Sequence, residues 1–255
     1  MSERAGALRA SGRLFRIAGL AAVTLARTGA RSLRPGAPDR RRAAAALIAR
    51  ASRTALAIHH LEVESSGPRP VGPALLVSNH LSYLDPLVVA TCVDCLPISK
   101  ADLASWPIFG TVARRTGVLF VERSSPSSRI AVMRESERAL RDGALLLNFP
   151  EGTTTDGSTV LRFRKGLFGV ARELKVPVVP LALSYEPREL AWIGDDTFLP
   201  HYLRFSAIEG SRARIAFGEP INSRAHATPE DLAGVAHART LALLEERPAW
   251  LRKAR

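Results

Sequence analysis

Residues 77–86, VSNHLSYLDP, end one apolar run and lead into a second one. The first run, residues 74–77, is typical of a short buried strand. The second run, residues 87–90, follows Pro86, and a proline in the first turn favours a helix. The stretch therefore predicts a strand, a polar turn and a helix in succession, as in an α/β domain. With 255 residues, of which 46% are hydrophobic, the chain can bury a sizeable core.

The polar turn holds a histidine and a carboxylate five residues apart, His80 and Asp85. A neutral imidazole can take a proton from a hydroxyl group, and a carboxylate can fix the imidazole tautomer and stabilise the imidazolium that forms. We therefore predict that His80 is a general base and that Asp85 orients it. A histidine that makes only structural hydrogen bonds would fit the same spacing, so this prediction needs support from the rest of the chain.

Three further blocks follow the turn in a defined order. GVLFVER (residues 117–123) is a strand-like run that ends in charge, FPEGT (149–153) follows an apolar run, and VPVVPL (176–181) is strand-like again. In this order and at these separations, the blocks and the His80 turn resemble the phospholipid/glycerol acyltransferase family. That family includes bacterial 1-acylglycerol-3-phosphate acyltransferases. The resemblance covers residues 79 to 180.

The resemblance implies both a fold and a reaction. The expected fold is α/β, with a mixed central sheet flanked by helices, as in glycerolipid acyltransferases. The expected enzyme is a 1-acyl-sn-glycerol-3-phosphate acyltransferase. It would transfer a fatty acyl group from acyl-CoA or acyl carrier protein to the sn-2 hydroxyl of lysophosphatidic acid, and yield phosphatidic acid for phospholipid biosynthesis. His80 would deprotonate the hydroxyl for direct attack on the thioester, because the chain has no G-x-S-x-G nucleophile motif. The acyl donor is a co-substrate, and no cofactor or metal is expected.

The resemblance also implies a set of substrate-binding residues. Arg123 matches the arginine with which the family binds the phosphate of the acceptor. A guanidinium can bind a phosphate through two parallel hydrogen bonds. Lys100 is expected near the acyl carbonyl, and Glu151 is expected to hold the acceptor's polar glycerol region or to organise its loop. A glycine after that glutamate permits an unusual backbone angle or a close ligand approach. The expected set is completed by Asn79, Gly152 and Thr153.

The sequence after FPEGT departs from the family's commonest pattern. The motif often continues with Arg-Ser, whereas residues 154–156 here are Thr-Thr-Asp. An arginine that would help to hold the phosphate is therefore missing, and an acid lies nearby. Arg162, Arg164 and Lys165 follow and could compensate. Related lysolipid acyltransferases, including those that act on lyso-ornithine lipid, often tolerate such a change, so a phosphate-free lysolipid is the alternative acceptor.

The net charge of +12 is concentrated at one end of the chain. Residues 1–60 hold twelve arginines and no lysine against two acids, a net charge of +10, whereas residues 61–255 are close to neutral at +2. A strongly basic chain can be a non-catalytic protein that binds nucleic acid or a membrane. The near-neutral remainder and the His80 turn argue against that alternative. We therefore expect an anionic membrane surface as the partner, and no nucleic acid.

The basic segment has the pattern of a membrane-docking helix. Residues 14–26 are apolar but interrupted by Arg16 and Gly19, which is short of the roughly 20 apolar residues that span a bilayer. On a helix, one stripe of side chains would be basic at both ends and apolar in the middle. Such a helix would lie in the headgroup region of the membrane, with its arginines on lipid phosphates. The stripe consists of Arg9, Arg13, Arg16, Leu20, Val23, Arg27, Arg31 and Arg34. A solvated basic tail is the alternative.

Two domains follow from this division. Residues 1–60 are predicted to be a basic amphipathic membrane-binding helical arm, and residues 61–255 the acyltransferase α/β domain. Residues 33–38 break the arm, and Asp39 is expected to cap a second helix over residues 40–58. From this arm we predict peripheral or monotopic attachment to the cytoplasmic face of the cell membrane.

Three smaller expectations concern the remaining segments. Cys92 and Cys95 are interpreted as two small residues of one apolar helix in a reducing cytosol, because no second pair supplies zinc ligands. The aromatic stretch 191–203 is expected to be a loop. The sequence Thr-Pro-Glu-Asp from Thr228 is a strong helix start, and that helix is expected to reach Glu246.

Overall fold

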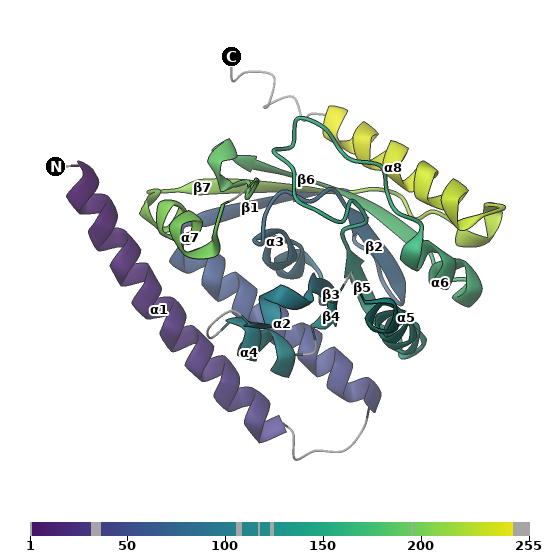
Figure 1. Cartoon of the computed structure of the whole chain (residues 1–255), viewed down its shortest axis with the longest axis horizontal. Coiled ribbons are helices and arrows are strands. Elements are labelled where there is room, and N and C mark those ends of the chain that lie inside the picture. The colour runs from purple at the N-terminus through teal and green to yellow at the C-terminus, as the bar shows by residue number, and fades with distance from the viewer. Residues whose placement is uncertain are drawn as a thin grey trace.

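A mixed seven-stranded sheet forms the centre of the fold (Figure 1). The computed structural model describes residues 2–31, 37–105, 109–116, 118–122, 125–194 and 196–246. The strand order is β1-β7-β6-β2-β5-β3-β4, and every neighbouring pair is parallel except β6 and β7. The strands are β1 (Leu61–Ser66), β2 (Ala74–Ser78), β3 (Cys95–Lys100), β4 (Leu119–Val121), β5 (Leu145–Asn148), β6 (Val178–Glu186) and β7 (Ser211–Phe217). The predicted mixed α/β sheet is therefore confirmed.

Helices cover both faces of this sheet. Figure 1 shows α5, α6 and α8 on one face and α2, α3 and α7 on the other, with α1 along the outside. The helices are α1 (Ser2–Arg31), α2 (Ala37–Ile58), α3 (Asp85–Cys92), α4 (Phe109–Arg115), α5 (Pro126–Arg141), α6 (Gly166–Leu174), α7 (Phe198–Ala207) and α8 (Pro229–Glu245). Short 3₁₀ turns are η1 (Ala101–Ser105), η2 (Arg188–Leu190) and η3 (Ser223–Ala225).

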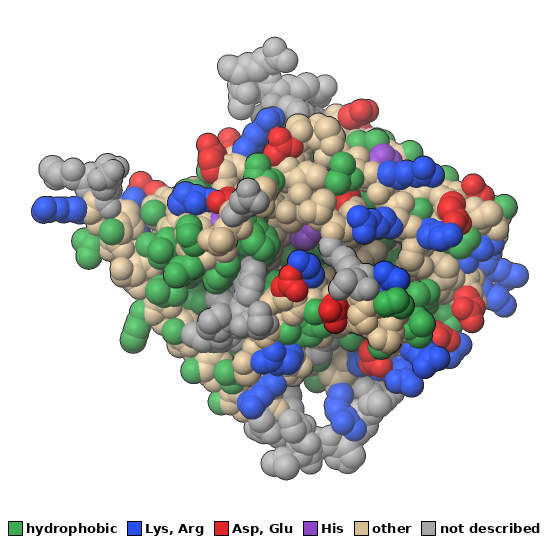
Figure 2. All heavy atoms as spheres, in the orientation of Figure 1, with side chains coloured by type: hydrophobic (Ala, Val, Ile, Leu, Met, Phe, Trp, Pro, Cys, Tyr) green, Lys and Arg blue, Asp and Glu red, His purple; other side chains and the backbone are tan. Residues whose placement is uncertain are grey.

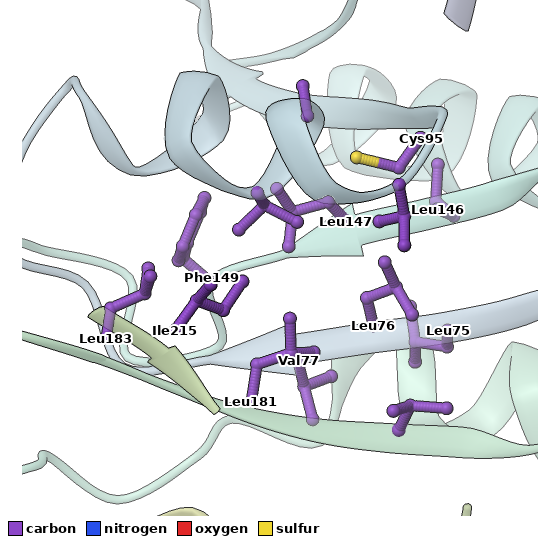
Figure 3. Close-up of a cluster of buried hydrophobic side chains, with 14 of the residues drawn as sticks. Leu75, Leu76, Val77, Cys95, Leu146, Leu147, Phe149, Leu181, Leu183 and Ile215 are labelled. Atoms are coloured by element: carbon purple, nitrogen blue, oxygen red, sulfur yellow. The ribbon is translucent and has the colours of Figure 1, made fainter. Parts of the chain in front are cut away.

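The core lies around β2, whose five residues are all buried. A strand with parallel neighbours and helices on both faces has no solvent side, which explains why this run is continuously apolar instead of alternating. Figure 3 shows Leu75, Leu76 and Val77 of β2 among apolar side chains of the neighbouring strands. Burial of each such side chain contributes about 1.5–3 kcal/mol. The carboxyl end of β2, where the polar turn begins, is thus held at a fixed place in the sheet.

Local signals in the sequence place two helix starts correctly. Pro86 lies in the first turn of α3, as predicted, and Asp85 is the first residue of that helix. At α8, the Thr228 hydroxyl accepts from the Asp231 N–H and the Asp231 carboxylate accepts from the Thr228 N–H, both at 3.1 Å. This reciprocal cap satisfies two helix-terminal donors. The helix ends at Glu245, one residue before the predicted end.

Three local predictions were wrong. Residues 198–207 form α7 instead of a loop, because Tyr202 and Phe205 recur at helical spacing and are buried. Cys95 is the first residue of β3, since Val93 is extended and ends the preceding helix. Both cysteines are free, and burial raises the pKa of the Cys95 thiol to about 12. The second helix begins at Ala37, so Asp39 lies inside it instead of capping it.

The two N-terminal helices pack against the sheet domain. Ala45, Ile48 and Leu56 of α2 belong to the same hydrophobic core as the strands. In α1, Arg13 is 6% exposed and donates through Nη1 to the Ser206 carbonyl at 3.0 Å, and Arg9 donates through Nε to the Ala207 carbonyl at 3.2 Å. Cations are favourable at the carboxyl end of a helix, here α7. These two arginines of the predicted lipid-facing stripe therefore hold α1 on α7 instead.

The division into residues 1–60 and 61–255 coincides with the short turn between α2 and β1, and membrane binding by the first segment stays a prediction. Within the described ranges, none of the helices combines the length and apolarity that a membrane crossing requires.

Candidate active site

The polar turn and FPEGT meet at one edge of the sheet. β2 and β5 are parallel neighbours, with Val77 opposite Asn148. His80 follows the carboxyl end of β2, and Phe149 follows the carboxyl end of β5. Two segments that are 70 residues apart in the sequence therefore lie side by side, at the edge where α/β sheets bind their ligands.

His80 and Asp85 contact each other as predicted. The Nδ1 atom of His80 lies 2.7 Å from Oδ2 of Asp85. Asp85 is fully buried, and the same oxygen accepts from the N–H groups of Leu81 at 2.7 Å and Ser82 at 3.0 Å. Its other oxygen, Oδ1, accepts from the Tyr185 hydroxyl at 2.6 Å. Four donors thus hold this carboxylate in one orientation against the imidazole.

This arrangement has the geometry that the predicted general base requires. Because Asp85 accepts from Nδ1, the proton of the neutral imidazole is on Nδ1 and the lone pair is on Nε2. The His80 side chain is 18% exposed, so a substrate can reach it. Phe149 stacks on the ring with centroids 4.2 Å apart and planes at 17°. The stacking and the Asp85 contact together fix the orientation of the ring and thus the direction in which Nε2 points.

Glu151 organises the loop around His80. It is 2% exposed, and both of its carboxylate oxygens accept hydrogen bonds. Oε1 accepts from the His80 N–H and Oε2 from the Leu161 N–H, each at 2.7 Å. Burial raises the pKa of Glu151, and these two backbone donors act in the opposite direction. Of the two roles expected for Glu151, the contacts show the loop-organising one.

The other predicted residues of the turn differ in their surroundings. Gly152 has a φ of +80°, the unusual backbone angle expected for it. Thr153 is exposed beside it. Asn79 is 1% exposed, and its amide both donates to the Leu183 carbonyl at 2.9 Å and accepts from the Leu183 N–H at 2.8 Å. Its side chain thus extends the pairing of β2 with β6, and substrate binding by Asn79 stays a prediction.

Among the described residues, no contact joins Lys100 to this cluster. Lys100 ends β3, two strands away from β2, and its ammonium pairs with Asp102. Its expected position near the acyl carbonyl stays a prediction. Arg123 lies outside the described residues, so its phosphate-binding role also stays a prediction.

Sequence reasoning missed the residues that hold the turn from the far end of the chain. Tyr185 comes from β6, 100 residues after Asp85, and is buried. Burial, with the Asp85 charge beside it, raises the pKa of Tyr185 well above its usual value, so the hydroxyl remains a donor. The N–H of Trp192 donates to the Leu81 carbonyl at 2.8 Å. The predicted strand ended before Tyr185, and the one signal available was that an aromatic residue stands between the polar residues Ser184 and Glu186.

An apolar cavity of about 180 Å³ opens beside the same turn. It lies between α1, α2, α3, α4 and α7, and Tyr83 and Leu84 of the turn form part of its wall. No Asp, Glu, Lys or Arg of the described ranges lines it. Burial lowers the pKa of His59, another wall residue, to about 4, so its ring is neutral at pH 7. The cavity therefore suits an uncharged, aliphatic group.

In the part of the chain that the structure describes, no three His, Cys, Asp or Glu side chains gather where they could hold a metal ion. The chemistry that the described groups offer is proton transfer at Nε2 of His80, next to a buried carboxylate and an apolar cavity.

Comparison with known proteins gives three matches of interest. Residues 60–184 match the model of a family described as Acyltransferase. A lyso-ornithine lipid O-acyltransferase from Pseudomonas aeruginosa is 38% identical over 168 residues, 64% of this chain and 65% of that protein. A 1-acyl-sn-glycerol-3-phosphate acyltransferase from Neisseria meningitidis is 31% identical over 175 residues, 68% of each chain. The chain thus spans slightly less than two thirds of the length of the first of these relatives.

A solved structure is similar over nearly the whole chain. The crystal structure of the 1-acyl-sn-glycerophosphate (LPA) acyltransferase from Thermotoga maritima superposes with a TM-score of 0.71 and covers 98% of this chain and 100% of its own. The two sequences are 20% identical, so this likeness shows the fold.

Proposed function

This chain belongs to the Acyltransferase family, as its sequence blocks predicted, and from that membership we propose that it is an O-acyltransferase that esterifies a lysolipid. The observation that carries the proposal is the contact of 2.7 Å between His80 and the buried Asp85 at the ligand-binding edge of the sheet. A general base on a fixed tautomer, next to an apolar cavity, is what the transfer of a fatty acyl group to a hydroxyl requires.

The proposed reaction needs one proton relay. Nε2 of His80 takes the proton of the lysolipid hydroxyl as its oxygen attacks the thioester carbonyl of acyl-CoA or acyl carrier protein. The new C–O bond forms, the C–S bond breaks, and the imidazolium returns the proton to the leaving thiolate. Asp85 stabilises the imidazolium in between. The products are an ester and a free thiol, without a covalent acyl-enzyme.

The apolar cavity supports an acyl substrate. Tyr83 and Leu84, which lie between His80 and Asp85 in the sequence, form part of its wall. Residues of α1 and α7 form another part. Apolar surface that leaves water contributes about 25 cal/mol per Å². An acyl chain in the cavity would therefore bind favourably while its carboxyl end remains near His80.

Two acceptors are candidates, and we propose lyso-ornithine lipid first. The relative from Pseudomonas aeruginosa that is 38% identical carries that name, and residues 154–156 lack the Arg-Ser continuation of FPEGT. Ornithine has a carboxylate and an amine but no phosphate. Lysophosphatidic acid, the acceptor predicted from the motifs, is the second candidate, since the Neisseria relative is named for it.

A panel assay tests the function directly. Purified protein is incubated with lyso-ornithine lipid, lysophosphatidic acid, lysophosphatidylcholine and monoacylglycerol, each with acyl-CoA and with acyl carrier protein. We expect acyl transfer to at least one lysolipid, with the highest kcat/KM for lyso-ornithine lipid. A higher kcat/KM for lysophosphatidic acid would reverse the order of the two acceptors. Absence of transfer to every lysolipid would refute the function.

We also propose that α1 and α7 rest on the cytoplasmic face of an anionic membrane. Leu8, Phe15 and Val23 of α1 are 75%, 82% and 50% exposed, and Leu199 of α7 is 56% exposed. Figure 2 shows hydrophobic side chains gathered over these two helices. Arginines elsewhere on the N-terminal segment add attraction of about 1 kcal/mol each near anionic lipid. Insertion of the apolar side chains adds a contribution to membrane binding that salt screens less.

Vesicle flotation measures this attachment. Because α2 contributes to the core, the surface should be changed by substitution and not by deleting residues 1–60. We expect the triple variant Leu8→Gln/Phe15→Gln/Val23→Gln to float with anionic vesicles several-fold less than the wild type. High salt should release the wild type only partly. Val71→Gln changes an apolar side chain that is 96% exposed elsewhere and is the matched control. Equal flotation of the triple variant and the wild type would show that this face is not the anchor.

A further inference from the structure

The guanidinium of Arg164 lies against the backbone of the FPEGT turn. A Cβ atom at Gly152 would be 2.9 Å from Cζ, 3.0 Å from Nη1 and 3.1 Å from Nε of Arg164. The guanidinium thus occupies the space that a side chain at position 152 would fill, and it would have to shift to admit one. The neighbouring Glu151 holds the His80 N–H at 2.7 Å. A cation is therefore placed one residue from the group that positions the catalytic histidine.

The backbone around Arg164 is fixed, whereas its side chain is exposed. The Arg164 N–H donates to the Pro150 carbonyl at 3.0 Å, and the preceding Phe163 is 4% exposed. The Leu161 N–H binds Glu151 on the same loop. Among the described residues, the Arg164 guanidinium itself has no recorded hydrogen bond or ion pair. The fold thus presents a cation at the turn without neutralising it.

The other charges after FPEGT are arranged differently. The Lys165 ammonium pairs with Glu230 at 2.6 Å, on α8. The Asp156 carboxylate, whose Oδ1 accepts from the Ser158 N–H at 2.9 Å and from the Ser158 hydroxyl at 2.6 Å, is engaged within its own turn. The three atoms nearest to the Cβ position of Gly152 all belong to Arg164, and none to Arg162. Arg164 is the cation that this loop directs to the site.

We propose that Arg164 binds the anionic group of the acceptor lysolipid, a carboxylate or a phosphate. A guanidinium binds either group bidentately, and charge-assisted hydrogen bonds of this kind are the strong ones. The commoner motif has an arginine directly after FPEGT, and this chain does not. The folded loop places the guanidinium of Arg164 beside the same turn instead. This inference rests on the proposed function and deepens it, because it assigns an anionic head group to the acceptor.

The test compares kcat/KM for acceptors that carry the anion with matched acceptors that lack it. Lyso-ornithine lipid is paired with its carboxamide, and lysophosphatidic acid with monoacylglycerol. Arg164→Ala should lower kcat/KM for the preferred anionic acceptor roughly 10- to 100-fold, mainly through KM, and leave the KM of the acyl donor unchanged. Activity on the matched neutral acceptor should not change. The sensitive pair identifies the anion as carboxylate or phosphate.

Two further variants separate charge from structure. Arg164→Lys should recover part of the lost kcat/KM, because it keeps the charge without the bidentate fork. Arg239→Ala removes an exposed arginine of α8 and should behave as the wild type on every acceptor. An equal fall on charged and neutral acceptors would overturn the inference in favour of a role in loop structure. Unchanged kinetics in a folded Arg164→Ala protein would overturn it as well.

Failure of the proposed function would be visible separately. In that case the wild type transfers no acyl group to any lysolipid, and acceptor binding is measured instead. Trp192, whose N–H bonds to Leu81 of the catalytic turn, provides a fluorescence signal for lysolipid in detergent micelles. A Kd for the anionic acceptor at least roughly tenfold weaker in Arg164→Ala would support the inference, and equal Kd values would overturn it.

Discussion

His80→Ala is expected to remove nearly all acyl transfer while leaving the fold intact. Loss of a general base alone lowers turnover by about 10²–10⁴-fold. Within the described part of the chain, the side chain makes one hydrogen bond, to Asp85, and it is 18% exposed, so its removal opens no large cavity in the core. The measurement is kcat on the preferred lysolipid, with circular dichroism and thermal unfolding to show that the variant is folded.

The matched control for this variant is another histidine outside the site. His226, between η3 and α8, is partly exposed and is not joined to the His80 cluster by any contact of the described residues. His226→Ala should keep wild-type kcat. Turnover near the wild-type value in a folded His80→Ala protein would show that the pair is structural and would refute the mechanism.

Asp85→Asn is expected to lower acyl transfer about as strongly as His80→Ala. It removes the charge of the side chain but keeps its shape, so it tests the electrostatic role of Asp85 alone. An asparagine has the same shape, and its carbonyl oxygen can still accept from His80 and from the Leu81 and Ser82 N–H groups. The Tyr185 hydroxyl can rotate and accept from the new amide. The neutral amide does not stabilise the imidazolium, so kcat should fall on the order of 10²–10⁴-fold with a modest change in stability.

Asp85→Ala provides the contrast. It leaves several donors unpaired in the protein interior, which costs about 3–5 kcal/mol of unfolding free energy. Denaturant unfolding should therefore show a much larger loss for Asp85→Ala than for Asp85→Asn. Tyr185→Phe removes one of four donors and should lower kcat about tenfold or less. If Asp85→Asn retained wild-type kcat, the carboxylate would have no electrostatic part in the reaction.

Most elements of the fold could be predicted because their signals are local. The apolar run before Ser78, the proline after Asp85 and the reciprocal cap at Thr228 each specify a strand end or a helix start within a few residues. Predictions failed where tertiary packing decided the outcome. The aromatic residues of α7 were interpreted as a loop, but they become helical because they are buried under α1.

The arginines of α1 show the same limit. Helical periodicity placed Arg9 and Arg13 on one stripe correctly, but periodicity does not say which side of a helix faces the protein. In the structure both arginines donate to carbonyls at the end of α7, nearly 200 residues away. The exposed apolar side chains of the opposite side, Leu8 and Phe15, are then the ones available to a membrane.

The sequence by itself determined the contact between His80 and Asp85, because both belong to one turn whose geometry is local. It also determined the succession of the motif-bearing strands along the chain and the location of the positive charge, but not the order of the strands in the sheet. Only the tertiary structure decided what surrounds that pair. Tyr185 binds Asp85 across 100 residues, Glu151 turns inward to the His80 backbone, and Arg164 covers Gly152. The first two contacts join segments that the pairing of β2 with β5 and β6 brings together, and the third depends on how the loop after β5 folds back on itself. No spacing within the sequence encodes them.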